Sequence, residues 1–224
     1  MTQPETEIRA AWRHIAGLHH DGYMDDVLIR YAEPHRHYHT ATHIMFVLRH
    51  LGDISRASGG DHSAAPSPEV VAAALYHDAI YDARADDNEA CSADLAVSDL
   101  DAVGWSHERC STVAALVMAT AGHLADDAGV DADGDAESDA DRAMLLDADL
   151  AILGAEPGAY LAYVNGVRAE YGHVDDDQWR AGRTVVLQRF LQRPRLFITD
   201  FMHDAYAHRA HANIEAELAA LRAE

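Results

Sequence analysis

The sequence is poor in the features that cross-link a protein or anchor it to a membrane. Its 224 residues include two cysteines, Cys91 and Cys110, which form neither a zinc-ligand spacing nor a disulfide framework. The first residues, MTQPETEIRAAW, lack the basic and apolar segments of a signal peptide. No apolar run approaches the roughly 18–20 residues that a membrane-spanning helix needs. We therefore expect a cytoplasmic protein without membrane contacts.

Basic residues are also scarce. The chain has 17 Lys and Arg residues against 38 Asp and Glu residues, a formal net charge of −21, and no local basic patch. Such a surface repels phosphate backbones, which excludes general nucleic-acid binding. A site for a phosphorylated ligand would need a metal ion or an arginine cluster to reverse this field.

Aromatic residues make up 7% of the chain, whereas Ala-rich runs with Leu, Val and Ile dominate and favour helices. Apolar residues recur with the helical period almost throughout, with little alternation of period two. We predict an all-α, single-domain bundle over residues 1–224, with an acidic loop inserted at about 124–138. The predicted helices cover residues 5–19, 24–32, 39–56, 68–82, 88–102, 106–122, 139–152, 157–171, 175–192 and 205–222.

The segment PHRHYHTATHIMFVLRH, residues 34–50, is unusually rich in histidine. His39 and His43 are four residues apart and share one face of the predicted helix. This spacing suits a metal-binding or acid–base pair, although surface or core histidines show it as well.

Two further segments place charged residues inside apolar helices. In AALYHDAIYD, His77 and Asp78 end an apolar run, where burying them is costly unless a divalent ion or a local hydrogen bond compensates. In MLLDADLAILG, Asp147 and Asp149 are two residues apart and face different directions, so we expect Asp149 in the site and Asp147 at its rim. Together with His43, these residues would form a mixed nitrogen and oxygen ligand set from three helices.

The ordered pattern His … His-Asp … Asp resembles the HD superfamily of metal-dependent phosphohydrolases. The segments RHYHTATH, YHDAIYD, DNEACSA and LLDADLAILG are similar to a bacterial subgroup, the predicted HD phosphohydrolases, and the similarity runs from about residue 5 to the C-terminal helix. It implies an HD-type helical bundle with a divalent ion (Mg, Mn, Fe, Ni or Zn) between helices, bound by His43, His77, Asp78 and Asp149. It also implies hydrolysis of a phosphate ester or anhydride of a small molecule, with nucleotides among the candidates, by metal-activated water.

The segment YHTATH also resembles the Tyr-His-x-x-x-His element of cyclic-nucleotide phosphodiesterases, which implies that His39 is the general acid and His43 a ligand. Asp78 would orient the attacking water. Arg36, just before the histidine pair, is a candidate phosphate clamp, with a solvated loop arginine as the alternative.

Other candidates are less directly tied to this pattern. Glu89 would hold a water or a second ion, or else complement the dipole of its helix. His123 would extend the site to two metals, or else stabilise the end of its helix. Tyr163 and Arg168, with Tyr171, would line a substrate pocket, or else occupy the edge of the core.

Two other functions stay open from the sequence. A di-iron oxygenase of the HD fold would need a second iron held by residues such as His123. A regulatory module would keep the helical shell and bind metal or ligand without turnover. The Ala-rich helical surface would also allow a homodimer.

Overall fold

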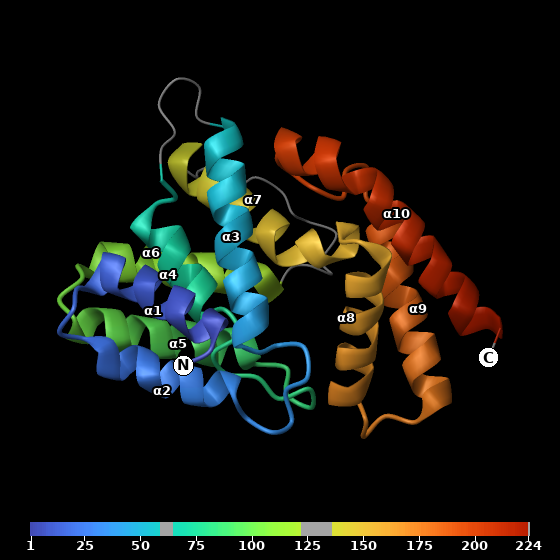
Figure 1. The fold of residues 1–224 in the computed structure, drawn as a ribbon, viewed down its shortest axis with the longest axis horizontal. Coiled ribbons are helices and arrows are strands. Elements are labelled where there is room, and N and C mark those ends of the chain that lie inside the picture. Colours follow the sequence, from blue (N-terminus) through green and yellow to red (C-terminus); the bar gives the residue numbers. More distant parts are fainter. Residues whose placement is uncertain (59–64, 122–135, 224) are drawn as a thin grey trace.

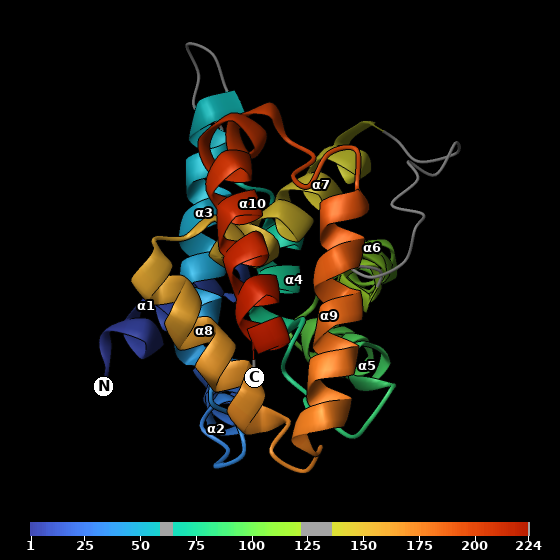
Figure 2. The same cartoon turned by 90° about the vertical axis from the view of Figure 1, so that its right-hand side faces the viewer.

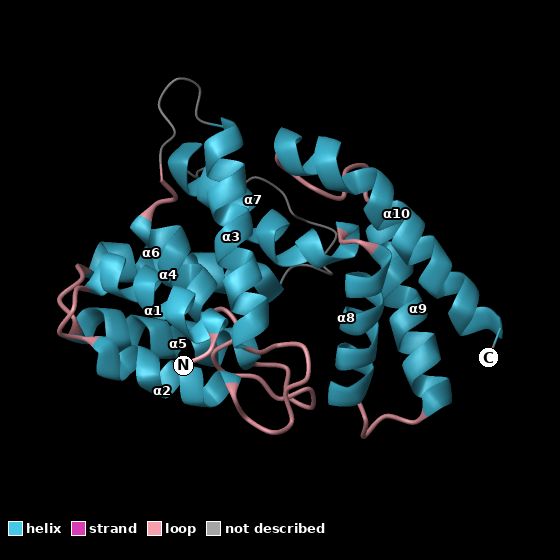
Figure 3. Ribbon diagram, viewed as in Figure 1, coloured by secondary structure: helices cyan, strands magenta, loops and turns pink. Residues whose placement is uncertain are grey.

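The computed structural model describes residues 1–58, 65–121 and 136–223, and most of them are helical (Figure 1). Within these ranges there is no strand, so the all-α prediction is confirmed (Figure 3). His123 and most of the predicted acidic loop lie outside the described residues. The elements are α1 (Gln3–Ala16), α2 (Asp21–Tyr31), α3 (Ala41–Ser58), α4 (Pro68–Tyr76), α5 (Asn88–Ala102), α6 (His107–Thr120), α7 (Ala136–Leu150), the 3₁₀ turn η2 (Ala151–Gly154), α8 (Pro157–Glu170), α9 (Asp176–Gln192) and α10 (Asp200–Ala223).

Side-chain caps explain where several of these helices begin. The Thr2 hydroxyl accepts from the backbone N–H of Glu5, and the Glu5 side chain accepts from the Thr2 N–H, which forms a capping box for α1. Ser67 caps α4 in the same way by accepting from Val70, with Pro68 at the first helical position. The predicted start of this helix at residue 68 is therefore confirmed.

One hydrophobic core connects the helices. It includes Trp12 from α1, Leu51 from α3, Leu75 from α4, Leu145 from α7 and Ile214 from α10, all fully buried. Figures 1 and 2 show α1, α2, α4, α5 and α6 grouped on one side and α8, α9 and α10 on the other, with α3 and α7 between them. The two central helices are therefore the ones that can present side chains to both groups.

The prediction of a helix over residues 68–82 is wrong at its C-terminal end, because α4 ends at Tyr76. The chain after Tyr76 makes other hydrogen bonds instead of another helical turn. The Arg36 guanidinium donates to the carbonyl oxygens of Asp78 (2.6 Å) and Ala79 (3.0 Å), and the Ile80 N–H donates to the Ser92 hydroxyl (3.0 Å). These contacts come from distant parts of the chain, which local periodicity does not report.

Gly154 is required where η2 crosses α10. A Cβ atom at this position would lie 2.8 Å from both the Cβ and the backbone oxygen of Tyr206. We expect Gly154→Ala to lower the free energy of unfolding by about 1–3 kcal/mol, because the backbone of α10 would have to move. Urea denaturation would measure this loss. Gly158→Ala is the control, since its Cβ would meet no atom within 4 Å, and equal stability of the two variants would contradict the prediction.

No helix within the described ranges combines the length and the apolar character that crossing a membrane requires.

Candidate metal centre

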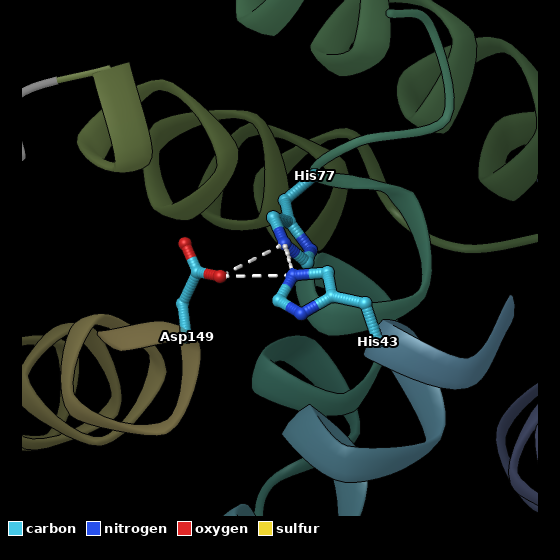
Figure 4. Close-up of side chains that lie close together, drawn as sticks. All are labelled: His43, His77 and Asp149. Atoms are coloured by element: carbon cyan, nitrogen blue, oxygen red, sulfur yellow. Dashed lines mark hydrogen bonds and ion pairs between the residues drawn. The ribbon is translucent and has the colours of Figure 1, made fainter. Parts of the chain in front are cut away.

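Histidine 43 lies on the buried face of α3. Its neighbours on that face, Ile44 and Val47, are fully buried apolar residues, and 4% of the His43 side chain is exposed. An imidazole in these surroundings needs a partner for its ring nitrogens, because an unpaired buried polar group is costly. Its Nε2 atom points toward His77 (Figure 4).

Histidine 77 follows the last residue of α4, a helix whose residues are mostly buried and apolar. Its side chain is 1% exposed, and its Nδ1 lies 3.0 Å from the carbonyl oxygen of Ala74. Because a carbonyl oxygen only accepts hydrogen bonds, Nδ1 carries the hydrogen and donates it. This bond orients the ring and leaves the Nε2 lone pair of His77 for the centre, as in metal-binding histidines.

Asp149, on α7, completes a close group with the two histidines (Figure 4). Its Oδ1 lies 3.0 Å from Nε2 of His43 and 3.5 Å from Nε2 of His77, and the two nitrogens are 3.3 Å apart. The three ligand atoms all lie within 4.8 Å of one another. Two imidazole nitrogens facing each other at this distance repel unless a proton or a cation lies between them, so this cluster can hold a metal ion.

Asp78 contacts both histidines from a second position. Its Oδ2 lies 3.2 Å from Nε2 of His77 and 3.4 Å from Nε2 of His43. It is not a member of the mutually close group, so its oxygen lies away from that of Asp149. The structure thus brings the four predicted ligands together, with three of them in mutual reach and Asp78 beside them.

The charges of the cluster are strongly coupled. Burial lowers the pKa of His43, but the hydrogen bonds and charges of Asp149 and Asp78 outweigh burial and raise it above its usual value. His77 follows the same pattern and its pKa is raised further. Burial raises the pKa of Asp78, yet the nearby His77 and His39 bring it well below its usual value. The two carboxylates therefore favour positive charge at the Nε2 atoms of the imidazoles, whether a proton or a bound cation supplies it.

Asp147 does not lie at the rim of the site, and this prediction is wrong. The residue is 1% exposed, and its carboxylate accepts from the backbone N–H groups of Ile198 and Thr199 (both 2.7 Å) and from the Thr199 hydroxyl (2.7 Å). It fixes the start of α10 against α7. The two residues of the Asp-Ala-Asp segment thus face different partners, as expected, but Asp147 has a structural role.

His39 lies beside the cluster, with its ring centre 5.9 Å from that of His43. Its Nδ1 lies 2.7 Å from Oε2 of Glu170, whose side chain is fully buried. An ionised carboxylate only accepts hydrogen bonds, so His39 donates from Nδ1 and keeps Nε2 for another partner. This arrangement suits an acid–base histidine held in one orientation.

Glu170 is the residue that the sequence reading missed. Its Oε1 accepts from the backbone N–H groups of His37, Tyr38 and His39 at 2.7–3.0 Å, and its Oε2 accepts from the Tyr81 hydroxyl at 3.0 Å. It comes from α8, more than 130 residues away in the chain. The available signal was its position at the C-terminal end of a helix, where a negative charge is unfavourable unless tertiary contacts compensate.

These hydrogen bonds make Glu170 a contributor to stability that depends on pH. Burial raises its pKa, but hydrogen bonds from His39 and the backbone lower it from its usual 4.5 to about 2. Since the carboxylate is favoured in the folded state, its contribution of about 2–3 kcal/mol is present above pH 4.5 and is lost as the pH falls toward 2. We expect Glu170→Gln to be less stable than the natural protein at pH 7, and the difference to shrink steadily below pH 4.5. Urea titrations across this range would measure it, with the exposed Glu215→Gln as control. A difference independent of pH would contradict the prediction.

The prediction that Arg36 clamps a phosphate is wrong. Its side chain is 0% exposed, and the guanidinium binds Glu33 and the carbonyl oxygens of His39, Asp78 and Ala79. All of these partners belong to the protein, so the guanidinium is not available as a phosphate clamp. Arg36 instead ties the loop before α3 to the loop after α4, which positions His39 next to the cluster.

The other predicted site residues separate into near and distant ones. Tyr163 packs edge-on against Tyr38, with ring centres 4.7 Å apart, in the wall of a cavity next to the cluster. Arg168 does not line this cavity. Its guanidinium instead binds the carbonyl oxygens of Tyr171 and Val174 and the Asp176 carboxylate, so it holds the turn between α8 and α9.

Glu89, at the start of α5, is not part of the metal-binding group. Its position in the first turn of the helix fits the alternative interpretation, an acid that complements the helix dipole. Burial, Glu170 and then Glu89 raise the pKa of Tyr171, so the charge of Glu89 acts on this tyrosine.

The cavity beside the cluster has a volume of about 540 Å³, within the usual range for small-molecule sites. His43 and Asp149 lie in its wall, together with residues of α3, η2, α8 and α10. A molecule in this cavity would therefore contact two of the candidate ligands directly.

No family model matches the chain, and no curated protein or solved structure matches it either.

Proposed function

We propose that this protein is a metal-dependent phosphohydrolase of the HD type, which hydrolyses a phosphate ester of a small molecule. The proposal rests on one arrangement: the Nε2 atoms of His43 and His77 face each other and the Asp149 carboxylate, beside a histidine that Glu170 holds in a fixed orientation. The resemblance of the sequence motifs to the HD superfamily supports the same reading.

The donor set fits a divalent cation of the first transition series or magnesium, because it combines imidazole nitrogen with carboxylate oxygen. A bound divalent ion would lower the pKa of a water ligand and offset the charge of the phosphoryl oxygens. It would also reverse the local effect of the net charge of −21, which otherwise repels a phosphorylated molecule.

The residues of the chain then have separate tasks. Asp78 contacts both histidines and is partly exposed (19% of its side chain), so it can accept a hydrogen bond from the attacking water. His39 donates a proton from Nε2 to the departing oxygen, since its Nδ1 is bound to Glu170. Glu170 acts through His39 as a positioning residue.

The di-iron oxygenase gains no support from the described residues, which contain a single group able to hold a metal ion. A regulatory module would bind metal at the same centre as a phosphohydrolase, so the centre does not separate these two functions. His39 discriminates between these two functions, because an acid–base histidine matters for turnover but not for metal binding.

The test is metal-dependent phosphate release. Protein stripped of metal would be reloaded with Mg, Mn, Fe, Ni or Zn and assayed on a panel of phosphate esters. We expect at least one ion to restore hydrolysis. Binding of metal without phosphate release from any ester would favour the regulatory module.

A second measurement tests the role of His39. We expect His39→Gln to lower kcat by about 10²–10⁴-fold on esters of alkyl alcohols, and much less on an ester with an acidic leaving group such as p-nitrophenol. Metal content should stay unchanged, and the exposed His19→Gln is the matched control. An equal loss on both esters would exclude general-acid catalysis by His39.

A further inference from the structure

The cavity beside the metal centre has a strongly apolar lining. Its walls come from α3, from η2 and the end of α7, and from α8 and α10, and they include Phe46, Val47, Ile152, Ala159, Tyr163 and Tyr206. Ala151 of η2 and Ala162 of α8 add to this apolar surface, and polar residues at and before the start of α3, such as Tyr38, Thr40 and Thr42, complete the wall. Such a surface gains free energy by contact with an apolar group.

The mouth of the cavity continues this apolar surface. Phe46 of α3 is 47% exposed, Ala159 of α8 is exposed as well, and both residues line the cavity. An apolar ligand would therefore remove exposed hydrophobic surface from water on both sides as it enters.

Positive charge in the cavity is limited. The chain contains no lysine, and the arginine among the lining residues is Arg209. Its guanidinium already donates to the Gly154 carbonyl oxygen (2.5 Å) and pairs with Glu156 (3.0 Å). A ligand with several phosphates would find few cationic side chains to offset its extra charges.

We propose that the substrate is a phosphate monoester of an apolar or aromatic alcohol. Its single phosphate would lie at His43 and Asp149, and its apolar body would occupy the space between Phe46, Ile152 and Tyr206. This inference rests on the proposed phosphohydrolase function and names its substrate class. Hydrolysis breaks the P–O bond to the alcohol, water supplies the new oxygen on phosphorus, and the alcohol leaves with the proton from His39. One hydrogen of the water stays on the phosphate and the other replaces the proton of His39, so the products are the alcohol and hydrogen phosphate.

The test is direct binding of two phosphonates that cannot be hydrolysed. Isothermal titration of the metal-loaded protein would compare phenylphosphonate with methylphosphonate. We expect the phenyl compound to bind on the order of tenfold tighter or more, because its ring is removed from water in the cavity. In parallel, phenyl phosphate should be hydrolysed with a higher kcat/KM than glycerol phosphate or ATP.

Variants locate the preference within the cavity. Ala159→Phe, at an exposed position, fills the cavity with a larger side chain, whereas Phe46→Ala removes an apolar contact from it. Each variant should reduce the preference for phenylphosphonate severalfold or more, while methylphosphonate binds as before. Leu161→Phe is the matched control, since Leu161 is exposed on the same helix and does not line the cavity.

The outcomes separate the two proposals. Equal affinity for both phosphonates, with ester hydrolysis retained, would overturn the apolar substrate class and leave the phosphohydrolase standing. A preference for phenylphosphonate that survives both cavity variants would place the ring elsewhere and overturn the inference as well. Tight, cavity-dependent binding of phenylphosphonate without hydrolysis of any ester would support the apolar site and overturn the phosphohydrolase.

Discussion

Replacing Asp149 with alanine is expected to remove the bound metal and to lower ester hydrolysis by about a thousandfold. The residue supplies the carboxylate oxygen that lies closest to His43, at 3.0 Å. A metal ion contributes several kcal/mol of charge stabilisation in hydrolysis, and about 4 kcal/mol corresponds to three powers of ten in rate. His77→Ala is expected to have the same effect, because its Nε2 lies 3.3 Å from that of His43.

Metal analysis of protein purified without chelator would measure the loss, with circular dichroism to show that the helices remain. Asp204→Ala, at an exposed position on α10, is the control and should keep its metal. If all variants contained the same amount of metal as the natural protein, the ion would be bound elsewhere and the assignment of the centre would be wrong.

The second large effect concerns the stability of the C-terminal helices. Arg183 on α9 and Glu217 on α10 form a buried ion pair, with Arg183 Nε 2.7 Å from Glu217 Oε1 and Nη2 3.1 Å from Oε2. Arg183→Ala would leave the Glu217 carboxylate buried without its cation, and the Tyr160 hydroxyl would still donate a hydrogen bond to it. We expect a loss of about 3–5 kcal/mol in the free energy of unfolding, because an uncompensated charge stays in the core. Urea denaturation would measure it.

The control for this prediction is on the same helix. Arg180 pairs with Asp177, whose side chain is 92% exposed, and Arg180→Ala should cost less than about 1 kcal/mol. The double variant Arg183→Met with Glu217→Leu should recover much of the loss, since no buried charge remains. A loss below 1 kcal/mol in Arg183→Ala would show that water reaches Glu217. Arg183 also donates to the Tyr163 hydroxyl (3.1 Å), so this network supports one wall of the cavity.

Local sequence signals predicted the helical class and singled out the residues of the candidate centre. Apolar residues at helical spacing predicted the helical class, and the predicted start of the fourth helix at residue 68 agrees with α4. His77 could be singled out because an ionisable group at the end of the apolar run AALY is costly to bury without a partner. The same argument selected Asp149 within the apolar end of α7.

The supporting contacts were not accessible in this way. Arg36 was predicted to clamp a phosphate, with a solvated loop arginine as the alternative, yet its guanidinium replaces the hydrogen bonds of a missing helical turn after Tyr76. Asp147 looked like the more dispensable of two neighbouring acids, yet it holds the start of α10. Each of these roles depends on a backbone segment at least 40 residues away in the chain.

The sequence by itself determined the helical class, the positions of most helices and the identity of the residues that converge on the candidate metal centre, because burial and periodicity are properties of neighbouring residues. The tertiary structure alone decided which groups hold these residues in place. Glu170 reaches His39 across more than 130 residues, and the cavity forms where α3, η2, α8 and α10 meet. Hydrogen bonds and walls of this kind arise from the packing of distant segments, and no local pattern in the chain specifies them.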